Sequence, residues 1–426
     1  MRVGILGCGN VGSALVTILR RDADVIAGRT GLRLEVGPVA VRSTTRERPA
    51  AVDRSLLTHD AAAVVADPSV DVIVEVIGGI EPARTLILAA LKAGKPVVTA
   101  NKELVANVGQ ELFEAAATAG VDLLFEAAVG GGIPLIRLLR ESLAGERIRR
   151  VTGIVNGTTN FILTRMTEEQ ASYSEALAEA QQLGYAERDP TADVEGYDAG
   201  AKASILASIA FGARVVAGDV YREGISAITA PDIAFAARLG YVVKLLAVAE
   251  QFDDGELAVR VHPAMVPVTH PLASVRDSFN AVFIEGESVG DLMLYGRGAG
   301  GMPTASAVLG DLIDAAYNLR AGGVGRTLNP APVRLRSIDD LTSAYYLDLE
   351  VVDRPGVLAR VAGVLGGHAV SIRSMEQDGL PEGGGAARVV FITHAARERD
   401  MQACLTELRS LDVVARIGTL LRVLGS

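Results

Sequence analysis

The feature that most constrains the fold is a glycine-rich turn, Gly7-Cys8-Gly9-Asn10-Val11-Gly12, which lies between two segments of different periodicity. Arg2–Leu6 before the turn is an apolar, strand-like run, and Val11–Arg20 after it has apolar residues at helical spacing. A strand that enters a helix through glycines at this spacing is typical of the first βαβ unit of a doubly wound sheet. The chain is therefore expected to begin with a Rossmann-type dinucleotide-binding unit.

A bound dinucleotide would use each glycine of this turn differently. Gly7 permits the tight bend, Gly9 lets the backbone approach a pyrophosphate, and Gly12 allows the helix to pack closely on the strand. The helix N-terminus adds N–H groups and the positive end of the helix dipole. The alternative is a glycine turn without a ligand. The residues of this domain expected to contact the dinucleotide are Gly7, Gly9, Asn10, Val11, Gly12, Arg42, Gly78 and Lys102.

The end of the second strand indicates the cofactor subtype. An acidic residue there usually binds the 2′-hydroxyl of NAD(H), whereas arginine accommodates the 2′-phosphate of NADP(H). The segment Val39–Ser43 carries no acid and contains Arg42, with Arg46 and Arg48 just after it. We therefore expect NADP(H) to be preferred, with NAD(H) as the other possible cofactor. The alternative is that these arginines lie in a solvated loop without a specific partner.

The segments that follow continue the alternation of strands and helices. Val70–Ile77 is a nearly continuous apolar run, which is typical of a strand buried on both faces. Repeated alternation of this kind predicts an α/β fold with a doubly wound parallel sheet. Further strands are predicted at Pro38–Arg42, Pro96–Thr99 and Val121–Phe125, and helices at Pro82–Ala93 and Lys102–Ala119.

The pattern changes after Gly130, and two further units are expected. Residues 131–296 mix helices with strands of alternating polarity, such as Ala258–Met265, and predict an α+β domain. Residues 321–343 are rich in Gly, Pro and Arg and are expected to form a linker. Residues 344–426 have the element order of a small ferredoxin-like domain, beginning with an alternating, half-buried strand at Tyr346–Val351. Helices are also predicted at Ser172–Leu183, Ala199–Ala213 and Thr304–Leu319.

Composition limits the classes of function. The 51 Asp and Glu residues outnumber the 41 Lys and Arg residues, and this acidic balance argues against a nucleic-acid or anionic-membrane partner. Cys8 and Cys404 lie too far apart for a disulfide scaffold or a clustered thiolate site. Val3–Leu19 carries no charge, but its glycines make it a poor membrane span, and no signal peptide is expected. These observations predict a cytoplasmic protein.

A dense motif extends from Gly184 to Lys202. Its fixed positions are Gly184-Tyr185, Asp189-Pro190, Asp193-Val194, Gly196, Asp198 and Lys202. This motif resembles the signature of the homoserine dehydrogenase family, and the number of matching spacings makes the resemblance specific. The resemblance extends over the whole chain through the segments 125–134, 156–160 and 298–306.

The resemblance implies an NAD(P)-dependent interconversion of L-homoserine and L-aspartate 4-semialdehyde, a step in threonine, methionine and isoleucine biosynthesis. Lys202 would then transfer the proton at the substrate oxygen as hydride moves. Asp198 lies four residues earlier, on the same helix face, and would position Lys202 and bind the substrate ammonium. The alternative is an ordinary surface ion pair, although the apolar run 203–210 indicates a largely buried helix.

The resemblance also implies roles for two other charged residues. Glu187 would hold the amino-acid end of the substrate, with Asp193 and Glu195 as nearby alternatives. Lys102, at the carboxyl end of a predicted strand, would lie near the nicotinamide and orient the developing oxyanion.

The catalytic side of the cleft is expected to close on the cofactor. Gly184 and Gly300 would touch the dinucleotide, so the segment 297–320 would return to the first domain and complete residues 1–130. Family members also bind a monovalent cation, Na⁺ or K⁺, between the two domains. Here the implied ligands are the Glu126 side chain and the carbonyl groups of Val129, Gly131 and Ile133. The alternative is a plain glycine-rich hinge.

The C-terminal unit resembles an ACT domain, a module that binds small molecules. Asp353-Arg354-Pro355-Gly356 follows its first strand, and Gly356 precedes a helix whose N-terminus can receive a carboxylate. Asp353 and Gly356 are therefore the expected effector residues. The resemblance implies feedback inhibition by L-threonine and assembly as a homodimer or a higher homo-oligomer. The alternative is an ACT domain used only for dimer contacts.

Two other functions compete with this interpretation. One is an amino-acid sensor that kept the fold and lost catalysis, and retention of the Lys102, Glu187, Asp198 and Lys202 set argues against it. The other is a dehydrogenase for a different small substrate, which the motif at 184–202 disfavours. A bifunctional kinase–dehydrogenase is not expected, because the dinucleotide motif stands at the start of the sequence.

Overall fold

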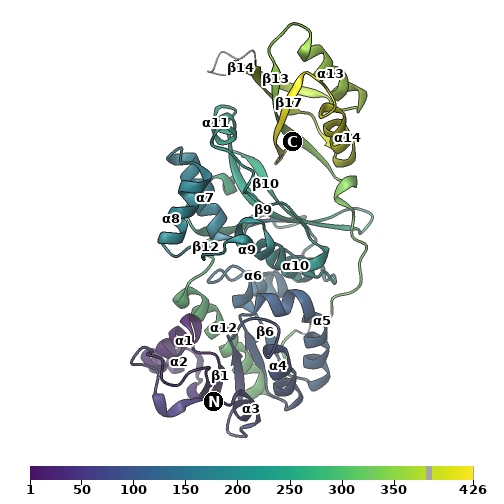
Figure 1. Ribbon diagram of the computed structural model, residues 1–426. Helices are drawn as coiled ribbons and strands as arrows, with labels where there is room; N and C mark the ends of the chain where they lie inside the picture. The colour runs from purple at the N-terminus through teal and green to yellow at the C-terminus, as the bar shows by residue number, and fades with distance from the viewer. Residues whose placement is uncertain (327, 380–385, 426) are drawn as a thin grey trace.

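The computed structural model describes residues 1–326, 328–379 and 386–425. Three parts follow one another along the long axis of the molecule, with the N-terminal part at the bottom of the view and the C-terminal part at the top (Figure 1). The N-terminal part is built on a six-stranded parallel sheet in the order β3-β2-β1-β4-β5-β6, which confirms the predicted doubly wound fold. Its strands are β1 (Arg2–Leu6), β2 (Glu35–Ala40), β3 (Leu57–Thr58), β4 (Val72–Glu75), β5 (Val97–Thr99) and β6 (Leu123–Leu124).

The helices of this part come from two distant regions of the chain. Five precede residue 120: α1 (Asn10–Arg21), α2 (Ala23–Thr30), α3 (Ala61–Ala66), α4 (Ala83–Lys92) and α5 (Lys102–Ala119). The sixth, α12 (Gly301–Ala321), returns after the middle part and packs against α1. Its apolar side chains Ala305, Val308 and Leu312 are fully buried in the same cluster as Ile5 and Leu15. The core of the N-terminal part therefore includes a helix that begins at residue 301, after the whole middle part in the sequence.

Two of the predicted strands have different bounds in the structure. The run 70–77 forms a strand only over Val72–Glu75, because the Glu75 carboxylate accepts hydrogen bonds from the backbone N–H groups of Ile77 and Gly78 and turns the chain out of the sheet. The prediction for Pro38–Arg42 was wrong at both ends, since β2 runs from Glu35 to Ala40. Arg42 therefore lies in the loop beyond the strand.

The middle part is an antiparallel sheet covered by helices. Its strands occur in the order β12-β11-β7-β9-β10: β7 (Ile148–Ile154), β9 (Tyr241–Gln251), β10 (Leu257–Pro267), β11 (Phe279–Gly286) and β12 (Gly290–Arg297). Its longer helices are α7 (Gly157–Glu168), α8 (Tyr173–Gln182), α10 (Tyr197–Phe211) and α11 (Ala230–Arg238). Short elements are α6 (Leu135–Arg137), α9 (Thr191–Val194) and β8 (Tyr221–Arg222). The alternation predicted for Ala258–Met265 does not correspond to one exposed face, because α10 and a second apolar cluster bury both faces of β10.

The C-terminal part has the ferredoxin-like sheet order β17-β13-β15-β14. Its elements are β13 (Thr342–Val352), α13 (Val357–Gly367), β14 (Ile372–Gly379), β15 (Ala386–Thr393), β16 (Ala396–Arg397), α14 (Glu398–Leu408) and β17 (Val414–Val423). The end of β17 pairs in parallel with β10, Ala264 opposite Arg422, so the middle and C-terminal sheets are continuous. The segment predicted as a linker is also held against the middle part, where Ala331 bridges to Ala213 and Leu335 to Leu257.

The first strand of the C-terminal part was predicted to be half-buried, and this prediction was wrong. Its polar face is covered by α11, whose Asp232 is fully buried. The Asp232 carboxylate accepts hydrogen bonds from Tyr346 Oη and Arg388 Nη2, both at 3.0 Å, and from Thr419 Oγ1 at 2.7 Å. Asp348 on β13 pairs with the same arginine at 2.7 Å. The polar residues of this face therefore form a buried network between the two parts.

Across the described ranges, no helix combines the length and the apolar character needed to cross a membrane.

Candidate active site

A cavity of about 1070 Å³ lies where the carboxyl ends of the N-terminal strands meet the middle part. Ligands of doubly wound sheets bind at this edge. The cavity is lined by the start of α5, the start of α7, the segment 183–202 and the turn 297–300. Among the residues expected from the sequence, those that line it are Lys102, Gly184, Glu187, Asp198, Lys202 and Gly300.

Two lysines and one carboxylate form the charged centre of this cavity. Asp198 Oδ2 lies 2.6 Å from Lys202 Nζ, and Asp198 Oδ1 lies 2.8 Å from Lys102 Nζ. Asp198 and Lys202 stand four residues apart on α10, as the sequence spacing predicts, whereas Lys102 comes from the first turn of α5. The carboxylate therefore bridges the dinucleotide-binding part and the middle part of the molecule.

Burial differs between the two lysines. The Lys202 side chain is 11% exposed and Lys102 is 44% exposed, while Asp198 is 9% exposed. Burial opposes the charge of Asp198, but the two lysines outweigh it and hold the pKa of Asp198 well below its ordinary value. Burial also opposes the charge of Lys102, but its attraction to Asp198 prevails and the pKa of Lys102 is raised. The centre is thus an ionised carboxylate between cationic groups.

Neighbouring backbone and amide groups fix the orientation of this centre. Lys202 Nζ donates a second hydrogen bond to the carbonyl of Val155 at 2.7 Å. Asn156, at the start of α7, donates from Nδ2 to Asp198 at 2.9 Å and to Asp193 at 2.7 Å. Burial raises the pKa of Asp193, which also lines the cavity. Asn156 lies in a segment that the sequence resemblance covers, but its role as a bridge between two carboxylates was not predicted.

The position of Lys102 depends on a buried carboxylate that sequence reasoning missed. Glu75, at the end of β4, accepts from Ile77 N at 2.7 Å and from Thr99 Oγ1 at 2.5 Å. Asn101 caps α5 through the N–H of Leu104 and donates to the carbonyl of Gly79 at 2.6 Å. Glu75 lies within the apolar run 70–77, and an acid in a segment predicted to be a buried strand was the available signal.

The three candidate carboxylates for the substrate ammonium separate in the structure. Glu187 is exposed and Asp193 is partly buried, and both line the cavity. Glu195 lines a different cavity, next to the C-terminal part. Because Glu195 does not line the catalytic cavity, it is not a candidate to bind the substrate ammonium in place of Glu187.

The glycine-rich turn has the shape expected of a phosphate-binding loop. Gly7 has φ of +104°, and a Cβ there would lie 2.7 Å from the carbonyl oxygen of Val76. A Cβ on Gly12 would collide with the carbonyl of Gly7, whereas a Cβ on Gly9 would face open space. Gly9 is the N-cap residue of α1 and has no side chain to accept a hydrogen bond from the first N–H groups of the helix. These N–H groups are therefore not satisfied by a side-chain cap at Gly9. These features fit a bound pyrophosphate.

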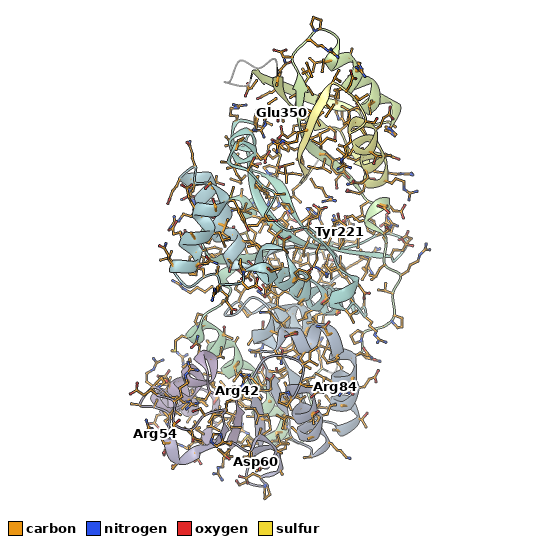
Figure 2. All side chains as sticks on the ribbon, viewed as in Figure 1. Arg42, Arg54, Asp60, Arg84, Tyr221 and Glu350 are labelled. Carbon is orange, nitrogen blue, oxygen red and sulfur yellow. The ribbon has the colours of Figure 1, made fainter. Side chains whose placement is uncertain are left out.

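The arginines after β2 have different surroundings. Arg42 is exposed in the N-terminal part (Figure 2). Arg48 folds back over the glycine-rich turn and donates to three backbone carbonyl groups, those of Cys8 at 3.3 Å, Ser43 at 2.8 Å and Arg46 at 3.1 Å. No carboxylate pairs with Arg48 among the described residues. Its charge is thus available to an anion beside the turn.

The segment expected to hold a cation has oxygen donors of the right kind. Glu126 is 4% exposed, and its carboxylate accepts from the N–H groups of Ile136 at 2.9 Å and Arg137 at 2.7 Å. Gly130 and Gly131 both have positive φ, so the backbone turns sharply between Val129 and Ile133. A buried carboxylate beside a tight turn of carbonyl groups fits a hard monovalent cation.

The expected effector residues lie on the surface of the C-terminal part. Gly356 has φ of +90° and caps α13, and Asp353 is exposed and accepts one 3.5 Å hydrogen bond from Gln377. They are distant in sequence from the residues that line the catalytic cavity. Neither Asp353 nor Gly356 lines that cavity, so the expected effector position is separate from the catalytic site.

A glycine-rich turn that fits a dinucleotide, together with acid–base groups that line a cavity, supplies what an enzyme needs to move a hydride and a proton at one carbon–oxygen bond. The fold and the site together define an NAD(P)-dependent oxidoreductase acting on a CH–OH group.

Comparison with known proteins narrows this class. The family model of the homoserine dehydrogenase NAD-binding domain matches residues 7–126, that of homoserine dehydrogenase matches 134–313, and that of the ACT domain matches 345–413. The chain belongs to the homoserine dehydrogenase family. The homoserine dehydrogenase of Corynebacterium glutamicum is 49% identical, over 99% of this chain and 95% of its own. That of Mycobacterium tuberculosis is 48% identical, over 100% of this chain and 98% of its own.

Solved structures agree with this assignment. A crystal structure of a homoserine dehydrogenase from Thiobacillus denitrificans has a TM-score of 0.92 at 40% identity, and the match covers 99% of this chain and 98% of that one. A homoserine dehydrogenase from S. aureus has a TM-score of 0.79 at 33% identity, with coverage of 100% and 99%. The predicted family, fold class and type of enzyme are confirmed.

Proposed function

We propose that Lys202 is the proton donor and acceptor in the interconversion of L-homoserine and L-aspartate 4-semialdehyde. The observation that carries this proposal is the 2.6 Å contact between Lys202 and Asp198 at the wall of the catalytic cavity. When bound, the nicotinamide cofactor would exchange a hydride with the carbon that bears the substrate oxygen.

Lys202 has the hydrogen-bond capacity that this role requires. A protonated lysine offers three N–H donors, and two of them point to Asp198 and to the Val155 carbonyl. The third remains for the substrate oxygen. In reduction of the aldehyde, Lys202 gives this proton to the oxygen as it becomes a hydroxyl. In oxidation, the neutral amine takes the hydroxyl proton, and Asp198 stabilises the ammonium that forms.

Lys102 and Glu187 complete the substrate site in this proposal. Lys102 shares Asp198 with Lys202 and is the more exposed of the two lysines, so its remaining N–H groups are directed to the substrate oxygen or carboxylate. Glu187, which also lines the cavity, supplies an exposed carboxylate for the substrate ammonium. Asp193 lines the same cavity and offers a second acceptor.

We propose NADP(H) as the preferred cofactor. The segment after β2 has no acid at 41–43, and Arg48, which pairs with no carboxylate in the part of the chain that the structure describes, donates to the Cys8 carbonyl in the glycine-rich turn. Arg42 and Arg48 would bind the 2′-phosphate, while Gly7, Gly9 and Gly12 would accommodate the pyrophosphate. Gly78, Gly184 and Gly300 are proposed as further contacts.

Several finer assignments rest on the same resemblance. Glu126 and the carbonyl groups of Val129, Gly131 and Ile133 would hold Na⁺ or K⁺ and stiffen the hinge. The proposed domains are 1–130 with 297–320, 131–296 and 344–426, joined by the linker 321–343, the last two ranges including residues outside those described. Homodimer formation, a cytoplasmic location and inhibition by L-threonine near Asp353 and Gly356 complete the proposal.

The test is steady-state oxidation of L-homoserine with NADP⁺ and with NAD⁺ by the wild type and by Lys202→Ala. We expect wild-type turnover that favours NADP⁺, and a loss of kcat of at least about a hundredfold in a folded Lys202→Ala variant. Near-normal kcat in that variant would remove Lys202 from the proton-transfer role. Equal use of the two cofactors would refute the NADP(H) preference alone.

A further inference from the structure

A cavity of about 350 Å³, separate from the catalytic cavity, lies between the N-terminal and middle parts. Its walls are formed by residues between 105 and 114 of α5, the second half of α10, residues 214–216 and Pro330. The two helices contact each other where these parts of the molecule meet (Figure 1). We call it the α5–α10 cavity. None of Lys102, Asp198 and Lys202 lines it.

The inner lining of the α5–α10 cavity is apolar. It includes the buried side chains of Val105, Phe113, Phe125, Ile205 and Val215. The rings of Phe113 and Phe125 stack with their centroids 5.6 Å apart. Such a lining accepts the apolar body of a small molecule, and an aromatic ring can pack on the phenylalanine pair.

Helix α5 departs from helical geometry beside this cavity. Val108 has φ of −129° and ψ of 16°, and both it and Gly109 line the cavity. A break inside a helix interrupts its hydrogen-bond ladder. The first turns of α5, which carry Lys102, are therefore less rigidly joined to the rest of the helix than in a regular helix.

The polar groups of the lining favour an anion that also carries a hydrogen-bond donor. Arg214 is exposed and pairs with no carboxylate in the described ranges, whereas Glu111 is neutralised by Arg84 (Figure 2), with 2.7 Å between Nε and Oε2. Glu114 is exposed and accepts a hydrogen bond from Gln110 Nε2 at 2.7 Å. Gln110 Oε1 is buried and has no partner among the residues that the structure describes. A rotation of this amide would turn the oxygen toward a donor on a bound molecule.

Other classes of ligand suit this lining less well. A divalent cation requires several free oxygen ligands, and the Glu111 carboxylate is already paired with arginine. A nucleotide would bring several phosphate charges to the one unpaired cation, Arg214 of the described lining residues. The ammonium of a zwitterion would find only the solvent-exposed Glu114. An aromatic carboxylate with a hydroxyl group meets the apolar lining, Arg214 and Gln110 together.

The α5–α10 cavity adjoins the catalytic cavity along both helices. Asn107 of α5 lines both cavities. On α10, Lys202 lines the catalytic cavity, and Ile205 and Ile209 follow it by three and seven residues, on the same face of the helix, and line the α5–α10 cavity. A molecule bound between the two helices therefore acts on the spacing of the turns that carry the active-site lysines.

We propose that the α5–α10 cavity binds a small aromatic carboxylate that carries a hydroxyl donor, and that its occupancy changes the affinity of the catalytic cavity for substrate through the spacing of α5 and α10. The binding part stands independently of the proposed reaction, whereas the coupling part rests on it. The site shares no residue with the effector position expected at Asp353 and Gly356.

The test is calorimetric titration of the full-length protein with 4-hydroxyphenylacetate. Three analogues each change one feature of this probe. Phenylacetate lacks the hydroxyl donor, tyramine has an ammonium in place of the carboxylate, and acetate lacks the aromatic body. The KM for L-homoserine is then measured with and without 4-hydroxyphenylacetate.

Two variants change the cavity, and a third is a control. Arg214→Gln removes the cation from an exposed position, and Ile209→Trp fills the cavity from a partly buried one. Arg29→Gln, at an exposed arginine of α2, controls for the loss of charge. Because Arg214→Gln alters a surface side chain, it decides the question even if Ile209→Trp does not fold.

We expect 4-hydroxyphenylacetate to bind, with affinity reduced about tenfold or more in Arg214→Gln and in Ile209→Trp and unchanged in Arg29→Gln. Phenylacetate should bind about fivefold or more weakly, and tyramine and acetate should not bind measurably. No binding to the wild type, full binding by both cavity variants, or equal binding of tyramine would overturn the proposal. Binding with an unchanged KM for L-homoserine would refute the coupling. Absence of homoserine turnover with intact binding would instead count against the proposed reaction.

Discussion

Replacing Asp198 with asparagine tests whether the shared carboxylate organises the catalytic centre. The change preserves the shape of the side chain but removes the charge that two lysines share at 2.6 and 2.8 Å. Lys102 is 44% exposed, so solvent compensates for much of its loss. Lys202 is 11% exposed, and leaving a buried cation without its partner costs about 3–5 kcal/mol. If the same free energy is lost from stabilisation of the transition state, kcat/KM for L-homoserine falls by about 10²–10⁴.

The assay is steady-state oxidation of L-homoserine, accompanied by urea unfolding at several pH values. The pKa of Asp198 is depressed in the folded protein, so its contribution to stability is present above the ordinary value of 3.8 and is lost only as pH falls through the lower folded pKa. The stability gap between wild type and Asp198→Asn should therefore persist at neutral pH and close only in strong acid.

A matched control comes from an exposed pair with the same spacing. Arg165 and Glu169 also stand four residues apart, at 2.9 Å, but Glu169 is 56% exposed. Glu169→Gln should change neither kcat/KM nor stability by more than about 0.5 kcal/mol. The reasoning about Asp198 fails if folded Asp198→Asn retains kcat/KM within about threefold of the wild type.

Three other substitutions probe features outside the catalytic centre. Asp232→Asn should destabilise the protein by about 2–4 kcal/mol, because it leaves Arg388 and the hydroxyl groups of Thr229, Tyr346 and Thr419 with a weaker acceptor. Hydrogen exchange should quicken in β13 and β17, and unchanged protection there would contradict this expectation. Burial lowers the pKa of Lys244 to about 8, so the folded state binds fewer protons than the unfolded state between pH 8 and 10.5, and stability should rise with pH over that window. The rise, at most about 3 kcal/mol, should be absent in Lys244→Met; an equal rise in both proteins during urea unfolding would refute the assignment. Glu75→Gln should raise the KM for NADP⁺ about tenfold by loosening the turn at Gly78, while a KM unchanged from wild type would show that this carboxylate has no such role.

The parts that sequence alone predicted well have local or short-range causes. The glycine-rich turn, the buried strands and the spacing of Asp198 and Lys202 depend on residues close together in the chain, and the structure places them accordingly. The element order of the C-terminal part was also readable, because its strands and helices alternate over a short length. The position of Lys102 at the carboxyl end of a strand indicated a ligand-binding residue, and the family resemblance gave it a role. Nothing local indicates that it meets Asp198 across two domains.

Other features depend on contacts that no local pattern encodes. Asp348 lies in a strand whose alternating pattern predicts one solvent-exposed face. In the structure α11 covers that face, and Arg388 neutralises the Asp348 carboxylate. The position of Glu195, in a cavity separate from Glu187, follows from how β17 packs on the middle part. Glu75 lies within an apolar run, and only the turn after β4 explains why a carboxylate is buried there. Each of these outcomes is set by tertiary packing rather than by periodicity.

The late entry of α12 has a consequence for how the chain acquires its structure during synthesis. The first 130 residues leave the ribosome with the apolar surface of Ile5 and Leu15 uncovered, because the helix that carries Val308 and Leu312 has not yet been translated. At about 5–20 residues per second, the nearly 200 intervening residues take roughly 10–40 s to appear. The nascent N-terminal segment is thus exposed to aggregation for that interval, and a chaperone that shields this surface would raise the yield of native protein more than it would for a domain made from one continuous stretch.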